Sequence, residues 1–257
     1  MALSKTHTMA FLIALKRAGK KNIWEKMLPG VLLPDAIRCY GLSRIVTHFE
    51  KHYITGEASG IEFPAISKLK TLDKDKVANL RIVNAENLSG EKLDYEQVAI
   101  GDETSLTAFK MMNSHLPNLD FKSIQIHLIQ DSVYDEYIRQ VIDCSLRRYP
   151  GNIFKFEGKI FDAKQVRQLI SEIEEQEFRY MCSIFEKENG EKIDQKWFDE
   201  NVKPIIFSAY SPEMAEKTWA YIKIDNDSPN PCHLPEYKVS GIVNSLIACS
   251  EKALETL

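Results

Sequence analysis

The sequence lacks any long hydrophobic run. Its longest uninterrupted apolar segment, Met9–Leu15, is far shorter than the ~20 residues that a bilayer-spanning helix needs. No small-residue cleavage site follows this segment, so it does not resemble a secretory signal peptide. We therefore predict a protein without integral membrane association.

Cysteine pairs and an excess of positive charge are also missing. The five cysteines are widely spaced and form no C-x-x-C pair, which argues against a disulfide framework and a thiolate zinc site. Reduced thiols in a cytoplasmic protein are the simpler interpretation. The net charge is −4, whereas a duplex-binding domain usually presents a basic face. We expect no stable nucleic-acid complex, although the basic stretch 16–21 can attract an anion transiently.

Helical periodicity dominates what the sequence does contain. We predict a mainly α protein whose residues 1–257 form a single helical domain. The predicted helices cover residues 6–18, 22–27, 42–53, 105–114, 121–148, 162–187, 196–209, 212–224 and 239–257. Pro29-Gly30 is expected to end the second helix. Pro34 is expected to open a further helical turn, with Asp35 as a candidate N-cap.

Residues 56–104 interrupt this pattern and are predicted to form an insertion within the helical domain, partly β or irregular. The segment contains several glycines and no sustained helical period. Residues 80–88 and 97–103 are typical of short strands in a hairpin-like excursion. A segment of this length is a candidate lid or rim.

The predicted helix 121–148 carries a polar pair on its apolar face. At 100° per residue, Ile124 and Leu128 fall on the face that should be buried, and Asp131 falls in the middle of the same face. His127 lies one turn before Asp131. An ionised carboxylate in a core is costly unless it is compensated. The compensation is either a hydrogen bond or ion pair, from His127 or from an arginine such as Arg38 or Arg44, or a divalent metal ion.

Three upstream residues of metal-ligating type also stand in apolar surroundings. His7 precedes the longest apolar run, Asp35 follows Pro34, and His48 lies in the stretch VTHFE. Each has a structural interpretation as well: a helix-start residue, an N-cap and a hydrogen-bonded core histidine, respectively. The remaining histidines, predicted to be exposed or in loops, are His52, His115 and His233.

The order H…PD…THF…HLxxD resembles the zinc-dependent phospholipase C / S1-P1 nuclease superfamily, in particular its bacterial phospholipase-C-like members. The matching residues are His7, Asp35, His48, His127 and Asp131. The resemblance implies an all-α fold whose helices converge on metal ions. It further implies that Asp35, His48, His127 and Asp131 hold one zinc ion, and that His7 helps to hold a second one bridged by Asp131.

Two features depart from that family. Its secreted members use a freed N-terminal residue as a ligand, and its three-zinc members take further His and Glu ligands after the H-x-x-x-D helix. Here the only histidine after Asp131 is His233. The acids Asp135, Glu136 and Asp143 are the candidates to replace the missing ligands. We therefore expect one or two ions. The HD phosphohydrolases are disfavoured because the sequence contains no His-Asp dipeptide.

The expected function is that of a metal-dependent hydrolase, a phosphoesterase in which metal-activated water attacks a small, soluble phosphodiester or phosphomonoester. Asp35 or Asp135 is the candidate base, and Arg38 is the candidate phosphate-binding residue. The alternative is a non-catalytic helical binding protein with a structural metal or a His/Asp network, which binds a partner through residues 56–104. No particular protein partner is predicted.

Overall fold

The computed structural model describes residues 4–52, 57–83, 98–99, 103–141, 154–156, 159–161, 163–222, 234–255 and 257. Over these residues the chain is mainly helical, which confirms the predicted class. The α-helices are α1 (Ser4–Arg17), α2 (Trp24–Ala36), α3 (Arg44–Thr47), α4 (Lys74–Ala78), α6 (Glu103–Asn113), α7 (Asn118–Val141), α8 (Ala163–Asn189), α9 (Gln195–Asn201), α10 (Lys203–Ala209), α11 (Pro212–Ile222) and α12 (Glu236–Leu254). The 3₁₀ helices are η1 (Lys21–Ile23), η2 (Ile37–Tyr40) and η3 (Ile66–Thr71). The strands are β1 (Lys51–His52), β2 (Gly60–Ile61), β3 (Ile82–Val83), β4 (Val98–Ala99), β5 (Phe154–Phe156) and β6 (Lys159–Phe161).

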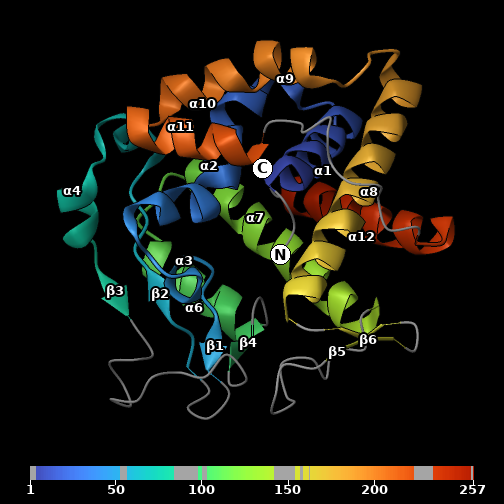
Figure 1. Ribbon diagram of the computed structural model, residues 1–257. Coiled ribbons are helices and arrows are strands. Elements are labelled where there is room, and N and C mark those ends of the chain that lie inside the picture. Colours follow the sequence, from blue (N-terminus) through green and yellow to red (C-terminus); the bar gives the residue numbers. More distant parts are fainter. Residues whose placement is uncertain are drawn as a thin grey trace.

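Helix α7 lies at the centre of the fold. It packs most extensively against α2 and α12, and α1 packs in turn against α12 and α8. Figure 1 shows α7 crossing the middle of the molecule, with α9, α10 and α11 along one side and the short strands at the opposite side. A helix in this position is enclosed by neighbours, so polar side chains on it must find partners inside the protein.

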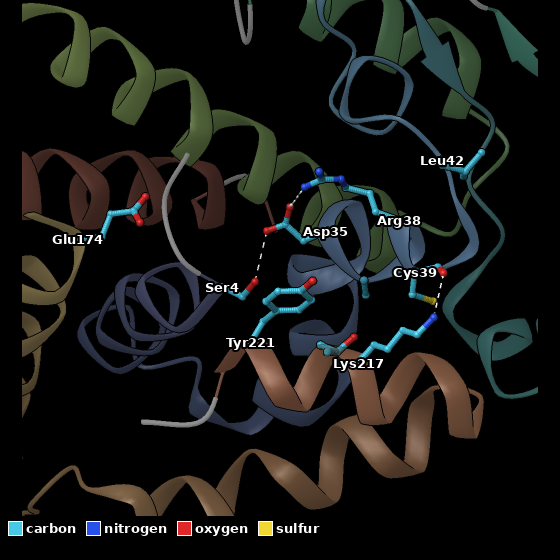
Figure 2. A pocket seen from close by; sticks show the side chains of 10 residues that line it. Ser4, Asp35, Arg38, Cys39, Leu42, Glu174, Lys217 and Tyr221 are labelled. Atoms are coloured by element: carbon cyan, nitrogen blue, oxygen red, sulfur yellow. Dashed lines mark hydrogen bonds and ion pairs between the residues drawn. The ribbon is translucent and has the colours of Figure 1, made fainter. Parts of the chain in front are cut away.

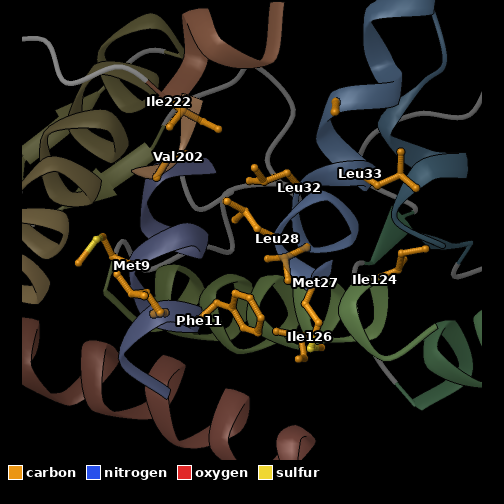
Figure 3. Close-up of a cluster of buried hydrophobic side chains, with 14 of the residues drawn as sticks. Met9, Phe11, Met27, Leu28, Leu32, Leu33, Ile124, Ile126, Val202 and Ile222 are labelled. Atoms are coloured by element: carbon orange, nitrogen blue, oxygen red, sulfur yellow. The ribbon is translucent and has the colours of Figure 1, made fainter. Parts of the chain in front are cut away.

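The hydrophobic core fills the space between α1, α2 and α7 (Figure 3). Its labelled members include Met9, Phe11, Met27, Leu28, Leu32, Leu33, Ile124 and Ile126. Helix α1 is buried continuously from Ser4 to Leu15 because its apolar run has no polar face. Gly19, with a φ of 67°, follows the helix end as predicted.

Helix α2 departs most from the sequence prediction. A short helix ended by Pro29-Gly30 is wrong, because α2 runs through both Pro29 and Pro34. An internal proline costs about 3 kcal/mol, since it removes a hydrogen bond and crowds the preceding turn. Burial of most of the α2 side chains offsets this cost. Asp35 therefore lies in the last turn of α2, and its assignment as an N-cap is also wrong.

The predicted helix 42–53 is wrong beyond α3. Phe49 adopts a left-handed backbone conformation with a φ of 56°, which ends the helical path. Its buried ring packs against Phe63 and Phe109. Tertiary packing thus overrides the local helical period, and His48 becomes the residue that caps α3 at its C-terminus.

The described part of the predicted insertion 56–104 contains short antiparallel pairings. β2 pairs with β3, and β1 pairs with β4. Strands therefore occur in both stretches predicted to contain them. Among the described residues they pair with the earlier strands β2 and β1, and not with each other as in a hairpin.

The boundaries of two further predicted helices can be compared with the structure. The predicted helix 196–209 is divided at Val202 into α9 and α10, with Pro204 in the first turn of α10. Asp162, the first residue of the predicted helix 162–187, and the end of the predicted helix 121–148 lie outside the described residues. Among the residues that the structure describes, no helix is both long and apolar enough to span a bilayer.

Gly60→Ala tests the packing that turns the chain at Phe49. A Cβ atom at Gly60 would lie 2.2 Å from Cε1 of Phe49, so the ring must move and we expect a loss of about 1–3 kcal/mol in the free energy of unfolding. The matched control is Gly241→Ala in α12, where a Cβ meets nothing within 4 Å and a gain of about 0.5–1 kcal/mol is expected. Urea denaturation measures both variants. Equal effects at the two positions would contradict the packing argument.

Candidate metal centre

The histidines and aspartates predicted as metal ligands meet in one cluster. α1 supplies His7, α2 supplies Asp35, the residue after α3 is His48, and α7 supplies His127 and Asp131. The Asp35 side chain is 16% exposed, and the other four residues are at most 1% exposed. Five predicted site residues from separate parts of the chain are therefore brought together.

Asp131 lies at the middle of this cluster. Its Oδ2 atom is 2.6 Å from Nη2 of Arg44, 3.2 Å from Nε2 of His48 and 3.5 Å from Nε2 of His127. Its Oδ1 atom is 3.2 Å from Nε2 of His7. Burial by itself raises the pKa of Asp131, but the guanidinium of Arg44 and the adjacent imidazoles hold that pKa well below its usual range. Asp131 is therefore ionised.

Asp35 connects the cluster to the surface. Its Oδ1 atom is 3.3 Å from Nε2 of His48, 3.5 Å from Nη1 of Arg38 and 3.8 Å from Nη1 of Arg44. The hydroxyl of Ser4 donates to its Oδ2 atom at 3.3 Å. Burial raises the pKa of Asp35, but its hydrogen bond with His48 and the nearby imidazoles of His127 and His48 hold the pKa below its usual range. Asp35 is thus a second ionised carboxylate.

A hydrogen-bond chain from α12 orients His7. The hydroxyl of Ser250 donates to the carbonyl of Leu246 at 2.7 Å and accepts from the amide nitrogen of Gln130 at 2.7 Å. The amide oxygen of Gln130 then faces Nδ1 of His7 at 2.6 Å, so Nδ1 is the donor. In the uncharged form of the ring, Nε2 consequently presents a lone pair to the carboxylate of Asp131. A proton or a metal ion must lie between these two acceptors.

His48 is oriented in the same way. The hydroxyl of Thr47 donates to the carbonyl of Arg44 at 3.4 Å and so accepts from Nδ1 of His48 at 2.8 Å. Burial, and then the charge of Arg44, lower the pKa of His48 to about 3, so the ring is neutral. Its Nε2 lone pair faces oxygens of both Asp35 and Asp131. A proton moved to Nε2 would satisfy only one of them, whereas a cation would satisfy both.

The spacing of these atoms fits ligands around one metal ion. Bonds of about 2.0–2.1 Å to a tetrahedral zinc ion place neighbouring ligand atoms about 3.3 Å apart. Nε2 of His48 is 3.1 Å from Nε2 of His127, 3.2 Å from Oδ2 of Asp131 and 3.3 Å from Oδ1 of Asp35. The resemblance implies these four residues for one zinc ion; in the structure the ligand atoms of Asp35, His48 and His127 all lie within 4.8 Å of one another, and Asp131 is not in that group. A second group of ligand atoms, from His7, His127 and Asp131, also lies within 4.8 Å of one another.

A pocket of about 370 Å³ opens beside the cluster, with Asp35 in its wall. Figure 2 shows Arg38 and Ser4 directed at Asp35, and Glu174 from α8 further along the wall. Lys217 also lines the pocket; it pairs with Glu213 at 2.9 Å. Burial raises the pKa of Glu174 to about 8, so its carboxyl group is protonated at neutral pH. The pocket therefore combines two cations, one carboxylate and one neutral acid.

The other predicted residues lie in different settings. Asp135 is buried one turn beyond Asp131 on α7, and its role in the site stays a prediction. His115 pairs with Glu62 at 3.5 Å in the predicted helix-end position. The side chain of His52 and all of His233 lie outside the described residues.

Several contributors were not predicted from the sequence as site residues. The sequence offered Arg44 only as one possible ion-pair partner of Asp131, and the structure confirms that pair. Glu50, whose Oε1 atom is 3.3 Å from Nε of Arg44, was not identified. Gln130 and Glu174 were also missed. Of these residues, only Gln130 could have been suspected from the sequence, because it is a polar residue beside Asp131 on an apolar helix.

No family model, curated protein or solved structure matches this chain. The candidate centre therefore rests on its own geometry, and membership of the phospholipase C / S1-P1 nuclease superfamily stays a prediction.

Glu174→Gln tests the protonation of the pocket wall. A carboxyl group whose pKa is raised in the folded state stabilises the fold fully below its unfolded pKa of ~4.5 and loses that contribution as pH rises towards 8. We expect the wild type, freed of metal, to lose up to about 1.4 kcal/mol per pH unit relative to Glu174→Gln between pH 5 and 8. Urea denaturation at pH 5, 6, 7 and 8 measures the difference. A pH-independent difference, like that expected for the exposed control Glu200→Gln, would contradict this assignment.

Proposed function

We propose that the protein is a metal-dependent phosphoric ester hydrolase that acts on a small, soluble phosphodiester or phosphomonoester. The observation that carries the proposal is the convergence of the Nε2 lone pairs of His7 and His48 on ionised carboxylates at 3.2–3.3 Å. Such an arrangement repels itself unless a proton or a metal ion lies between the facing atoms, and a metal ion can satisfy both histidines and both carboxylates together. The sequence resemblance to zinc-dependent phospholipases C and S1-P1 nucleases supports the same conclusion.

The residues that would hold the ion are His48, His127, Asp131 and Asp35, with His7 on the other oxygen of Asp131. Two imidazoles and two carboxylates suit zinc, and they also accept manganese. A divalent ion in this position supplies the activation of a water nucleophile and positive charge for the phosphoryl oxygens.

The chain's own side chains would bind the substrate from the pocket. Arg38 and Lys217 line the wall next to Asp35 and can pair with the non-bridging oxygens of a phosphate. Asp35 is ionised and partly exposed there, so it can accept a proton from the attacking water. Asp135 does not line this pocket, and we therefore favour Asp35 as the base.

Glu174 is the candidate general acid. It is a buried, protonated carboxylic acid in the wall of the same pocket, on a different helix from Asp35. An ionised base and a neutral acid in one site are the pair that general acid–base catalysis needs. Glu174 would donate its proton to the leaving-group oxygen.

A non-catalytic binding protein is the second candidate. The ion pair of Arg44 with Asp131 at 2.6 Å favours it, because a guanidinium already compensates part of the buried charge. In that case the His/Asp network would be structural. Metal-dependent hydrolysis of a phosphate ester separates the two functions, because a binding protein can also hold a structural metal ion.

Metal removal and Asp131→Asn test the hydrolase. We expect the protein purified without added metal to contain zinc, manganese, iron or nickel by mass spectrometry. It should hydrolyse bis-p-nitrophenyl phosphate or p-nitrophenyl phosphate, and a chelator should abolish that activity. Asp131→Asn should lower turnover by about 100-fold or more because the mutation removes a ligand. The matched control, Asp199→Asn on the exposed face of α9, should retain full activity.

Two results would contradict the hydrolase. If the purified protein contains metal only at trace level, the proposed metal centre is contradicted. Equal activity in Asp131→Asn and the wild type would assign the hydrolysis to another site.

Glu174→Gln also tests the general acid. A p-nitrophenolate leaves without a proton, whereas an alkoxide needs one. We expect Glu174→Gln to slow hydrolysis of an alkyl phosphate ester by about 100-fold and that of the nitrophenyl ester by less than about threefold. Equal losses on the two esters would show that Glu174 is not the proton donor.

A further inference from the structure

The candidate centre contains more negative than positive charge. The guanidinium of Arg44 lies among three carboxylates: Nη2 is 2.6 Å from Asp131, Nε is 3.3 Å from Glu50 and Nη1 is 3.8 Å from Asp35. The Arg44 side chain is only 14% exposed, so solvent screens these charges weakly. Three carboxylates and one guanidinium leave two negative charges.

Among the described residues, the charged neighbours do not change this balance. Arg38, at 3.5 Å from Asp35, adds one positive charge, and the buried Asp135 adds one negative charge. Imidazoles that ligate a metal ion are uncharged, so the deficit equals the charge of one divalent ion.

We propose that the centre holds a single divalent ion and that Arg44 is its permanent second cation. This inference rests on the proposed metal centre. One ion makes the cluster neutral, whereas two ions would leave two buried positive charges in excess, which is costly. The two groups of ligand atoms share His127 and therefore do not form two independent sites.

Arg44 thereby takes a role that a second metal ion has in binuclear phosphoesterases. Arg44 does not line the pocket, so it would supply fixed positive charge beside the ion, and the phosphate itself would be bound by the ion together with Arg38.

Titration with Mn²⁺ tests the inference on the full-length protein after dialysis against a chelator. Electron paramagnetic resonance counts free and bound Mn²⁺, and thiols bind this ion poorly, so the cysteines do not interfere. We expect one Mn²⁺ per wild-type chain. Arg44→Gln should bind Mn²⁺ at least about tenfold more tightly, and Glu50→Gln at least about tenfold more weakly, because each changes the buried charge by one unit. Arg44→Lys should resemble the wild type.

The control Glu62→Gln removes a carboxylate that pairs with His115 and should leave Mn²⁺ affinity unchanged. The role of Arg44 is overturned if the wild type binds two or more ions. It is also overturned if Arg44→Gln and Glu50→Gln both bind Mn²⁺ with affinities within threefold of wild type. Neither result contradicts the proposed hydrolase. If the wild type binds neither Mn²⁺ nor Zn²⁺, the metal centre and this inference both fail. If Arg44→Gln does not fold, the Mn²⁺ affinity of Glu50→Gln alone tests the role of Arg44, because this variant retains the Arg44 pair with Asp131.

Discussion

The buried negative charge of Asp131 is the constraint on which the candidate centre depends. A carboxylate enclosed in the middle of the central helix is tolerated only if its surroundings supply positive charge and hydrogen-bond donors. α1 brings His7 to one of its oxygens, and α3 with the residue after it brings Arg44 and His48 to the other. The packing of α1 and α2 on α7 therefore serves an electrostatic requirement as well as the burial of apolar surface.

The sequence predicted the part of the site that depends on local periodicity. A 3.6-residue repeat is enough to place His127 and Asp131 on the buried face of α7, because that inference needs no knowledge of other elements. The same reasoning could not bring His7 or Asp35 to them, since their meeting depends on how separate helices pack. The resemblance in motif order supplied that step, and the structure brings the five residues into two groups of ligand atoms that share His127.

Where sequence reasoning failed, tertiary packing had overridden a local rule. Pro29 and Pro34 predict a break, yet α2 continues because nearly all of it is buried. Phe49 fits a helical pattern, yet its ring is seated against Phe63 and Phe109 by a left-handed turn. The relay from Ser250 through Gln130 to His7 joins helices 120 residues apart in the chain, and no local signal reveals such a contact.

The number of carboxylates around Arg44 bears on whether the cluster is a structural network or a metal centre. A cluster whose charges were fully balanced by arginine would be a structural network, and packed apolar residues would replace it at little cost in stability. Here one guanidinium lies among three carboxylates, and imidazole nitrogens of His7 and His48 face carboxylate oxygens at 3.2 Å, so a proton or a metal ion must lie between them. The same cluster meets the pocket through Asp35, the least buried of its proposed ligands. A cation held there, next to a pocket lined by Arg38 and Lys217, would meet the needs of the proposed phosphate chemistry, whereas a purely structural network would not need the pocket.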